Sequence, residues 1–188
     1  MTTRALAVAA LVLMTGGSDL AAAQSARRDS RHPPTRIIGQ TTVVGESDPT
    51  LWRTVLDLLP SRPGRIEVLD LDSLSGRARQ KLRGLDAFVL SGETTIVVIR
   101  QGATLRQAEF GDALDRLMLA SLVWHEMAHV NGLDERAALE QEEALWRRFI
   151  STGRVDGDVG MTYIARLREV SAATTNQSKV QVGGRPPC

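Results

Sequence analysis

The stretch from Asp112 to Gly132 constrains the fold of this chain more than any other part of its sequence. Asp112 suits the N-cap of a helix, and Gly132 suits its C-terminal end. Between them lies a series of apolar side chains: Leu114, Leu117, Leu119, Leu122 and Val123. The sequence therefore predicts a heavily apolar helix, which the rest of the domain has to cover.

The same predicted helix carries two of the three histidines of the chain, His125 and His129. Side chains four residues apart lie on one face of a helix, so both imidazoles can point at a single metal ion. Glu126 is displaced from His125 by about 100°, which puts it out of reach as a ligand but within reach of a metal-bound water. Two histidine ligands and a glutamate base in this spacing are typical of metal-dependent hydrolysis.

Through "HEMAH", His125 to His129, the chain resembles the zincin metallopeptidases. The resemblance covers this helix and the segment after it. It implies Zn²⁺ as cofactor, His125 and His129 as metal ligands, Glu126 as general base and a peptide or protein as substrate. It also implies that the substrate backbone pairs with a strand edge, for which the predicted strand Thr95 to Arg100 is the candidate.

A catalytic zinc needs a third protein ligand, and the helix predicted from Asp134 to Ile150 offers several glutamates. Its apolar face consists of Ala138, Leu139, Leu145, Trp146, Phe149 and Ile150. Glu142 lies near the centre of that face, whereas Glu143 lies near its edge and Glu140 on the solvent side. A glutamate within an apolar face has to be paired or bound to metal. The sequence therefore predicts Glu142 as third ligand, in a gluzincin-like arrangement, with Glu143 as an alternative.

A metzincin-like arrangement is a further alternative. In that branch the helix ends at a glycine, here Gly132, and the ligand follows three residues later, at Glu135. Metzincins carry histidine or, rarely, aspartate at that position, so the glutamate departs from their pattern. Met161 is the corresponding candidate for a Met-turn. Tyr163 is considered both as an oxyanion donor and as a packed helix residue.

The N-terminus has the three parts of a secretory signal peptide. Arg4 precedes an apolar run from Ala5 to Met14, and the small residues up to Ala23 follow. We expect cleavage near Ala23 and an exported (periplasmic or secreted) protein without a membrane anchor. Residues 24–35, with His32, are polar and basic and are predicted to be a flexible leader. The single cysteine, Cys188, leaves the domain without an internal disulfide.

The remaining pattern predicts an α+β domain over residues 36–170, with a short antiparallel or mixed sheet ahead of the active-site helix and helices after it. We expect a strand within residues 36–45, a helix from Pro49 to Pro60 and a strand from Ile66 to Leu71. A short polar helix, the strands Ala87 to Leu90 and Thr95 to Arg100, and a last helix near Tyr163 complete the pattern. Residues 171–188 are predicted to form a disordered tail.

The net charge of +1 at pH 7 gives no reason to expect a nucleic acid as partner. The first functional hypothesis is an exported zinc metallopeptidase. Two others remain open. The same ligands could hold a structural or vestigial metal in a non-catalytic domain, or the helix could belong to a metal-free interaction module. Glu126 favours the enzyme, because a structural site has no need of a base.

Overall fold

The computed structural model describes residues 33–45 and 48–182. The predicted signal peptide, almost all of the predicted leader, His32 and Cys188 lie outside these residues. Within them the chain forms a five-stranded mixed sheet and six α-helices, which confirms the predicted α+β class.

The sheet has the spatial order β1-β2-β3-β5-β4. Its strands are β1 (Thr35–Ile38), β2 (Thr41–Val44), β3 (Arg65–Leu69), β4 (Ala87–Val89) and β5 (Thr95–Ile99). The central strands β2, β3 and β5 are parallel to one another, and each edge strand is antiparallel to its neighbour. Where the sequence predicted one strand in residues 36–45, the structure has a hairpin that turns at Gly39, whose φ is 63°.

The place of β5 corrects one prediction from the sequence. The strand over Thr95 to Arg100 was the candidate for an edge that a substrate could join, but β5 pairs with β3 on one side and β4 on the other. An apolar run bounded by turns does not reveal where a strand stands in its sheet. The edge strand on this side is β4.

The helices are α2 (Pro49–Leu58), α3 (Gly76–Leu82), α4 (Ala103–Phe110), α5 (Ala113–Val130), α6 (Glu135–Ser151) and α7 (Gly157–Val182), with a 3₁₀ turn η1 (Leu71–Ser73). Asp48, Asp112 and Asp134 cap α2, α5 and α6 through their side chains, and the cap at Asp112 confirms the prediction from the sequence. The sequence predicted no helix for α4, which lacks a side-chain cap at Gly102 and leaves Phe110 exposed. The buried Asp86 instead contacts its first turn through Thr104.

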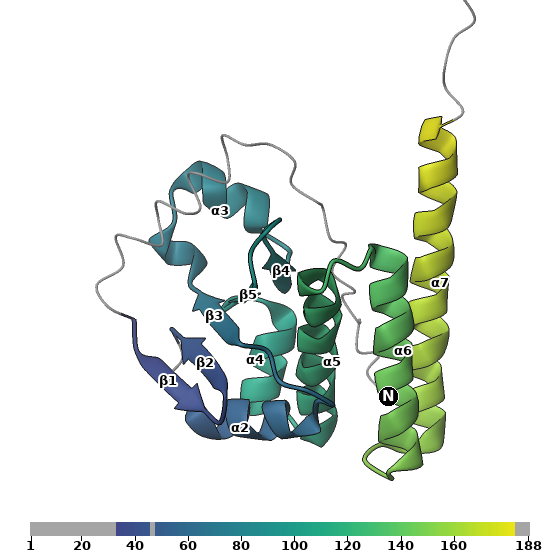
Figure 1. Ribbon diagram of the computed structural model, residues 1–188, viewed down its shortest axis with the longest axis horizontal. Coiled ribbons are helices and arrows are strands. Elements are labelled where there is room, and N and C mark those ends of the chain that lie inside the picture. The colour runs from purple at the N-terminus through teal and green to yellow at the C-terminus, as the bar shows by residue number, and fades with distance from the viewer. Residues whose placement is uncertain (1–32, 46–47, 183–188) are drawn as a thin grey trace, which may run out of the picture.

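The elements stack in layers, with α5 in the middle (Figure 1). One face of the sheet, with Ile96 and Val98, packs against α2, α4 and α5, and the other face, with Val97 and Ile99, packs against α3 and η1. Helix α6 covers the opposite side of α5, and α7 lies along α6 (Figure 1). The predicted apolar helix is thus covered on both sides.

Helix α7 extends beyond the expected end of the domain. It continues past Val170 to Val182, so the first part of the predicted tail is helical. Among the described residues, no helix combines the length and apolar character that a membrane crossing requires.

The turn between α5 and α6 brings the start of α6 back beside the end of α5. Gly132 has a φ of 80°, a left-handed conformation in which a side chain is strained, and its amide donates to the carbonyl of His129 at 2.9 Å. The amide of Leu133 donates to the carbonyl of Ala128 at 3.0 Å. This turn sets where Glu135, the first residue of α6, lies relative to the histidines.

We expect Gly132→Ala to lower the free energy of unfolding by about 1 kcal/mol, because a Cβ disfavours the left-handed conformation. A Cβ at Gly132 would meet no heavy atom within 4 Å beyond its chain neighbours, so the cost is conformational and not steric. Urea denaturation of the metal-free protein measures it. The control is Gly157→Ala at the start of α7, where the Cβ also meets open space. Equal stabilities of the two variants would contradict the argument.

Candidate metal centre

Helix α5 places His125 and His129 one turn apart, with their Nε2 atoms 3.1 Å from each other. Both side chains are nearly buried, at 8% and 9% exposed. Each Nδ1 is engaged on the far side of its ring. The Nδ1 of His125 lies 3.1 Å from Oε2 of Glu142, and that of His129 lies 3.0 Å from the carbonyl oxygen of Leu133. Because Nδ1 donates in both rings, both Nε2 lone pairs can face one point.

Glu135 supplies a third atom at that point. Its Oε2 lies 3.6 Å from Nε2 of His125 and 3.4 Å from Nε2 of His129. Zinc–ligand bonds of about 2.0–2.1 Å in tetrahedral geometry put neighbouring ligand atoms about 3.3 Å apart. The three measured separations, from 3.1 to 3.6 Å, surround this value. His125, His129 and Glu135 therefore fit three corners of a zinc tetrahedron and leave the fourth corner for water or substrate.

The position of Glu142 differs from the one expected for the third ligand. Glu142 lies on the buried face of α6, as expected, but it contacts Nδ1 of His125 and not the Nε2 side. The sequence placed Glu142 within the apolar face correctly, but the direction in which the His125 ring presents its two nitrogens is a tertiary property. Among the described residues, the group that could hold a metal ion consists of His125, His129 and Glu135, the metzincin-like alternative.

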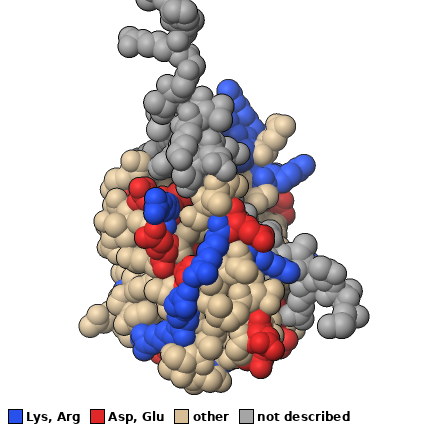
Figure 2. All heavy atoms as spheres, turned by 90° about the vertical axis from the view of Figure 1, so that its right-hand side faces the viewer, with Lys and Arg blue, Asp and Glu red and all other residues tan. Residues whose placement is uncertain are grey.

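The other candidates of the sequence lie away from the three ligand atoms. Glu143 pairs with Arg147 and Arg168, and these cations lower its pKa to about 2. On the side of the molecule that carries α7, acidic and basic side chains lie close together (Figure 2). Met161 is 47% exposed on α7 and does not underlie the site as a Met-turn would.

Tyr163 packs among the helices. Its ring stacks on that of Trp146 at a centroid distance of 4.0 Å, and its hydroxyl donates to Oε1 of Glu142 at 2.8 Å. Burial, together with the neighbouring Glu142, raises its pKa well above the usual range. The hydroxyl is thus committed to a buried carboxyl group, which supports the packed role for Tyr163 over the oxyanion donor.

Glu126 has the features of a general base. It is 2% exposed, and burial raises its pKa to about 7, although the neighbouring His125 and His129 act in the opposite direction. Its Oε2 is buried without a hydrogen-bond partner, and among the described residues the same is true of only Oε2 of Glu135 and Nε1 of Trp52. Two of these three atoms thus lie in this centre. An unpartnered buried carboxylate oxygen is costly, and a metal-bound water would satisfy Oε2 of Glu126, whereas Oε2 of Glu135 already lies 3.4–3.6 Å from the two imidazoles.

The charges in the metal-free protein are arranged for a cation. Burial disfavours the imidazolium of His125, but Glu135 and Glu142 outweigh this effect and raise its pKa to about 10. The pKa of His129 is also raised against the effect of burial, chiefly by Glu135. Burial likewise opposes the charge of Glu135, yet the two imidazoles lower its pKa to about 2. The shifted pKa values thus reflect attraction between the two imidazoles and the neighbouring carboxyl groups.

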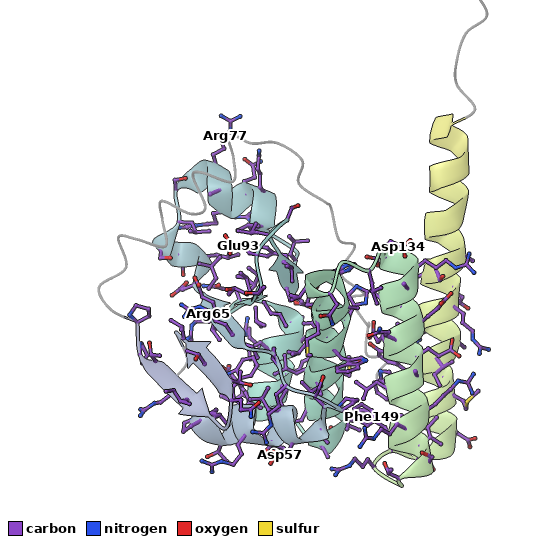
Figure 3. The ribbon with its side chains drawn as sticks, in the orientation of Figure 1. Asp57, Arg65, Arg77, Glu93, Asp134 and Phe149 are labelled. Atoms are coloured by element: carbon purple, nitrogen blue, oxygen red, sulfur yellow. The ribbon has the colours of Figure 1, made fainter. Side chains whose placement is uncertain are left out.

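The three candidate ligands come from elements that meet at one end of the helical layer. His125 and His129 lie in the last turns of α5, and Glu135 opens α6, directly after its cap Asp134 (Figure 3). At the other end of α6, the buried Phe149 packs on the side facing α5 and holds the two helices together (Figure 3). Packing along the α5–α6 seam therefore determines how closely the ligands approach.

Comparison of the chain with protein-family models, with curated proteins and with solved structures finds no match. Any functional argument therefore depends on the residues of the site.

Removal of the candidate third ligand should show in zinc binding. We expect Glu135→Gln to weaken zinc affinity by more than ~100-fold, beyond the effect of losing an outer partner of a ligand. The matched control is Glu140→Gln, on the exposed face of the same helix, where Glu140 pairs with Arg136. Competition with a chelating dye measures both affinities. Wild-type affinity in Glu135→Gln would remove Glu135 from the ligand set.

The metal-free protein should lose stability at alkaline pH. His125 has an unfolded pKa of ~6.5 and a raised folded pKa of about 10. Its contribution to the free energy of unfolding is therefore fully present below pH ~6.5 and is lost as the pH rises towards 10. Urea denaturation at several pH values in the presence of a chelator checks this. The loss should be smaller in Glu135→Gln, and a loss of equal size there would contradict the assignment.

Proposed function

We propose that this protein is a zinc-dependent hydrolase of peptide bonds. The observation that carries the proposal is the three ligand atoms of His125, His129 and Glu135, spaced as a zinc tetrahedron requires, beside a buried carboxyl group of Glu126. The segment from His125 to Glu135 resembles the metzincin-like pattern, with glutamate in place of its third histidine. We further propose export of the protein, because of the signal-peptide pattern up to Ala23.

The roles of the residues follow from their positions. Zinc held by His125, His129 and Glu135 would lower the pKa of a coordinated water towards neutrality and polarise a carbonyl group. Glu126, a buried carboxyl group on α5 directly after His125, would accept a proton from that water and deliver it to a leaving amine.

The sheet offers a place for an extended substrate. Strand β4 is the edge strand next to α5 and pairs through one side with β5. A peptide that added to the other side of β4 would make main-chain hydrogen bonds independent of its sequence. This route supports a peptide as substrate and replaces the one through β5 that the sequence suggested.

One observation favours a second candidate, a metal site without catalysis. The two histidines are less than a tenth exposed, which leaves little surface through which a substrate could reach a metal bound between them. Against it stands Glu126, whose unpartnered Oε2 has no structural use. Substitution of Glu126 separates the two candidates.

We expect Glu126→Gln to bind zinc as the wild type does and to lose peptidase activity by roughly 10²- to 10⁴-fold, as for loss of a general base. Zinc content by elemental analysis and cleavage of a fluorogenic peptide mixture give the two readouts. Glu143→Gln, in the surface pairs with Arg147 and Arg168, serves as control and should keep both properties. A zinc-loaded wild type without activity on any peptide would favour the structural site. Full activity in Glu126→Gln would exclude Glu126 as the base.

A further inference from the structure

Glu142 connects three helices behind His125. It is 5% exposed on α6, and it accepts from Ser121 of α5 at 2.7 Å and from Tyr163 of α7 at 2.8 Å, both at Oε1. Its Oε2 faces Nδ1 of His125 at 3.1 Å. All three contacts are buried or half-buried, so water does not substitute for them easily.

Two further contacts hold these donors in place. The indole Nε1 of Trp146 donates to Oγ of Ser121 at 2.7 Å, which directs the hydroxyl proton of Ser121 towards Glu142. The ring of Trp146 also stacks on that of Tyr163, with an interplanar angle of 21°. Trp146 therefore braces both donors that converge on Oε1, and Oε2 is left for His125.

This arrangement decides which nitrogen of His125 is free. A carboxylate is acceptor-only, so the proton of the neutral imidazole belongs on Nδ1 and the lone pair on Nε2. Nε2 is the atom that faces His129 and Glu135. A carboxylate behind a ligating histidine fixes the ring and raises the basicity of the ligand. Together, Glu135 and Glu142 also supply two negative charges, which balance a divalent cation in a buried centre.

We propose that Glu142, held by hydrogen bonds from Ser121 and Tyr163, is a positioning residue that orients Nε2 of His125 towards the metal. Helix α7 then contributes to the metal centre through Tyr163. The inference depends on the proposed zinc site and adds residues that do not touch the metal. It assigns to Tyr163 the role of holding Glu142, and it requires that the hydroxyl of Tyr163 matters for zinc affinity although it lies behind the ligand.

The test compares zinc dissociation constants and Co²⁺ absorption spectra of four variants. Glu142→Gln keeps the shape of the side chain but cannot accept from all three donors, and we expect a loss of zinc affinity of roughly 10- to 100-fold. Tyr163→Phe keeps the stack on Trp146 and removes one donor, and we expect a loss of roughly three- to tenfold. The double variant should bind within about twofold of Glu142→Gln alone, because both changes act through the same carboxylate. Both single variants should also shift the visible Co²⁺ bands, since the imidazole of His125 is no longer held.

Glu143→Gln is the matched control. Glu143 is the next residue along α6 and, through Arg168, also links α6 to α7, but it has no contact with His125. Glu143→Gln weakens the contact between α6 and α7 but leaves the contact between Glu142 and His125 unchanged. We expect its zinc affinity and Co²⁺ spectrum to match those of the wild type. Far-UV circular dichroism of each metal-free variant verifies that the compared proteins are folded.

The outcomes separate this inference from the proposed function. Wild-type affinity and spectra in both Glu142→Gln and Tyr163→Phe would overturn the positioning role while leaving the zinc hydrolase intact. An equal loss in Glu143→Gln would also overturn it, because helix docking alone would then explain the effect. If Glu142→Gln does not fold, Tyr163→Phe decides the question by itself. A wild-type protein that binds no zinc would overturn both the inference and the proposed function.

Discussion

The burial of α5 on both sides is the constraint on which the rest of the structure depends. Its apolar residues face the sheet on one side and α6 on the other, and Leu119, Ala120 and Val123 have no exposed surface. Burying a side chain such as Leu119 contributes on the order of 2 kcal/mol, so the two layers are held against this helix strongly. The polar groups that α5 carries into this seam then have to find partners there, because unpaired buried polar groups are costly.

The partners come from α6 and α7, and they link stability to the metal centre. Ser121, His125 and Glu126 are all buried on α5. Ser121 and His125 are satisfied by Glu142, whereas Glu126 keeps an unpartnered oxygen. A buried polar atom without a hydrogen-bond partner, in an interface where the neighbouring polar groups have partners, is expected at a functional site. At the proposed zinc site, protons and zinc would compete for His125, because metal binding requires a deprotonated imidazole nitrogen.

Local signals in the sequence were sufficient for most elements of the fold. Asp112 and Asp134 marked helix starts because a carboxylate directly before an apolar-periodic segment is typical of a helix N-cap. The sequence did not predict α4 because the side chain that contacts its first turn is Asp86, which is distant in sequence. The interior position of β5 was likewise hidden, since strand order depends on pairing between distant segments.

For the candidate site, the sequence by itself determined that His125 and His129 share a helix face with Glu126 beside them, because a spacing of four residues has only one geometric meaning on a helix. It also determined that Glu142 is buried. Only the tertiary structure decided which glutamate meets the imidazoles. The turn at Gly132 carries Glu135 to the Nε2 side, whereas the packing of α6 on α5 places Glu142 at Nδ1 of His125. The choice between ligand and support depends on the rotation of one ring within a packed seam, and helical periodicity carries no information about that rotation.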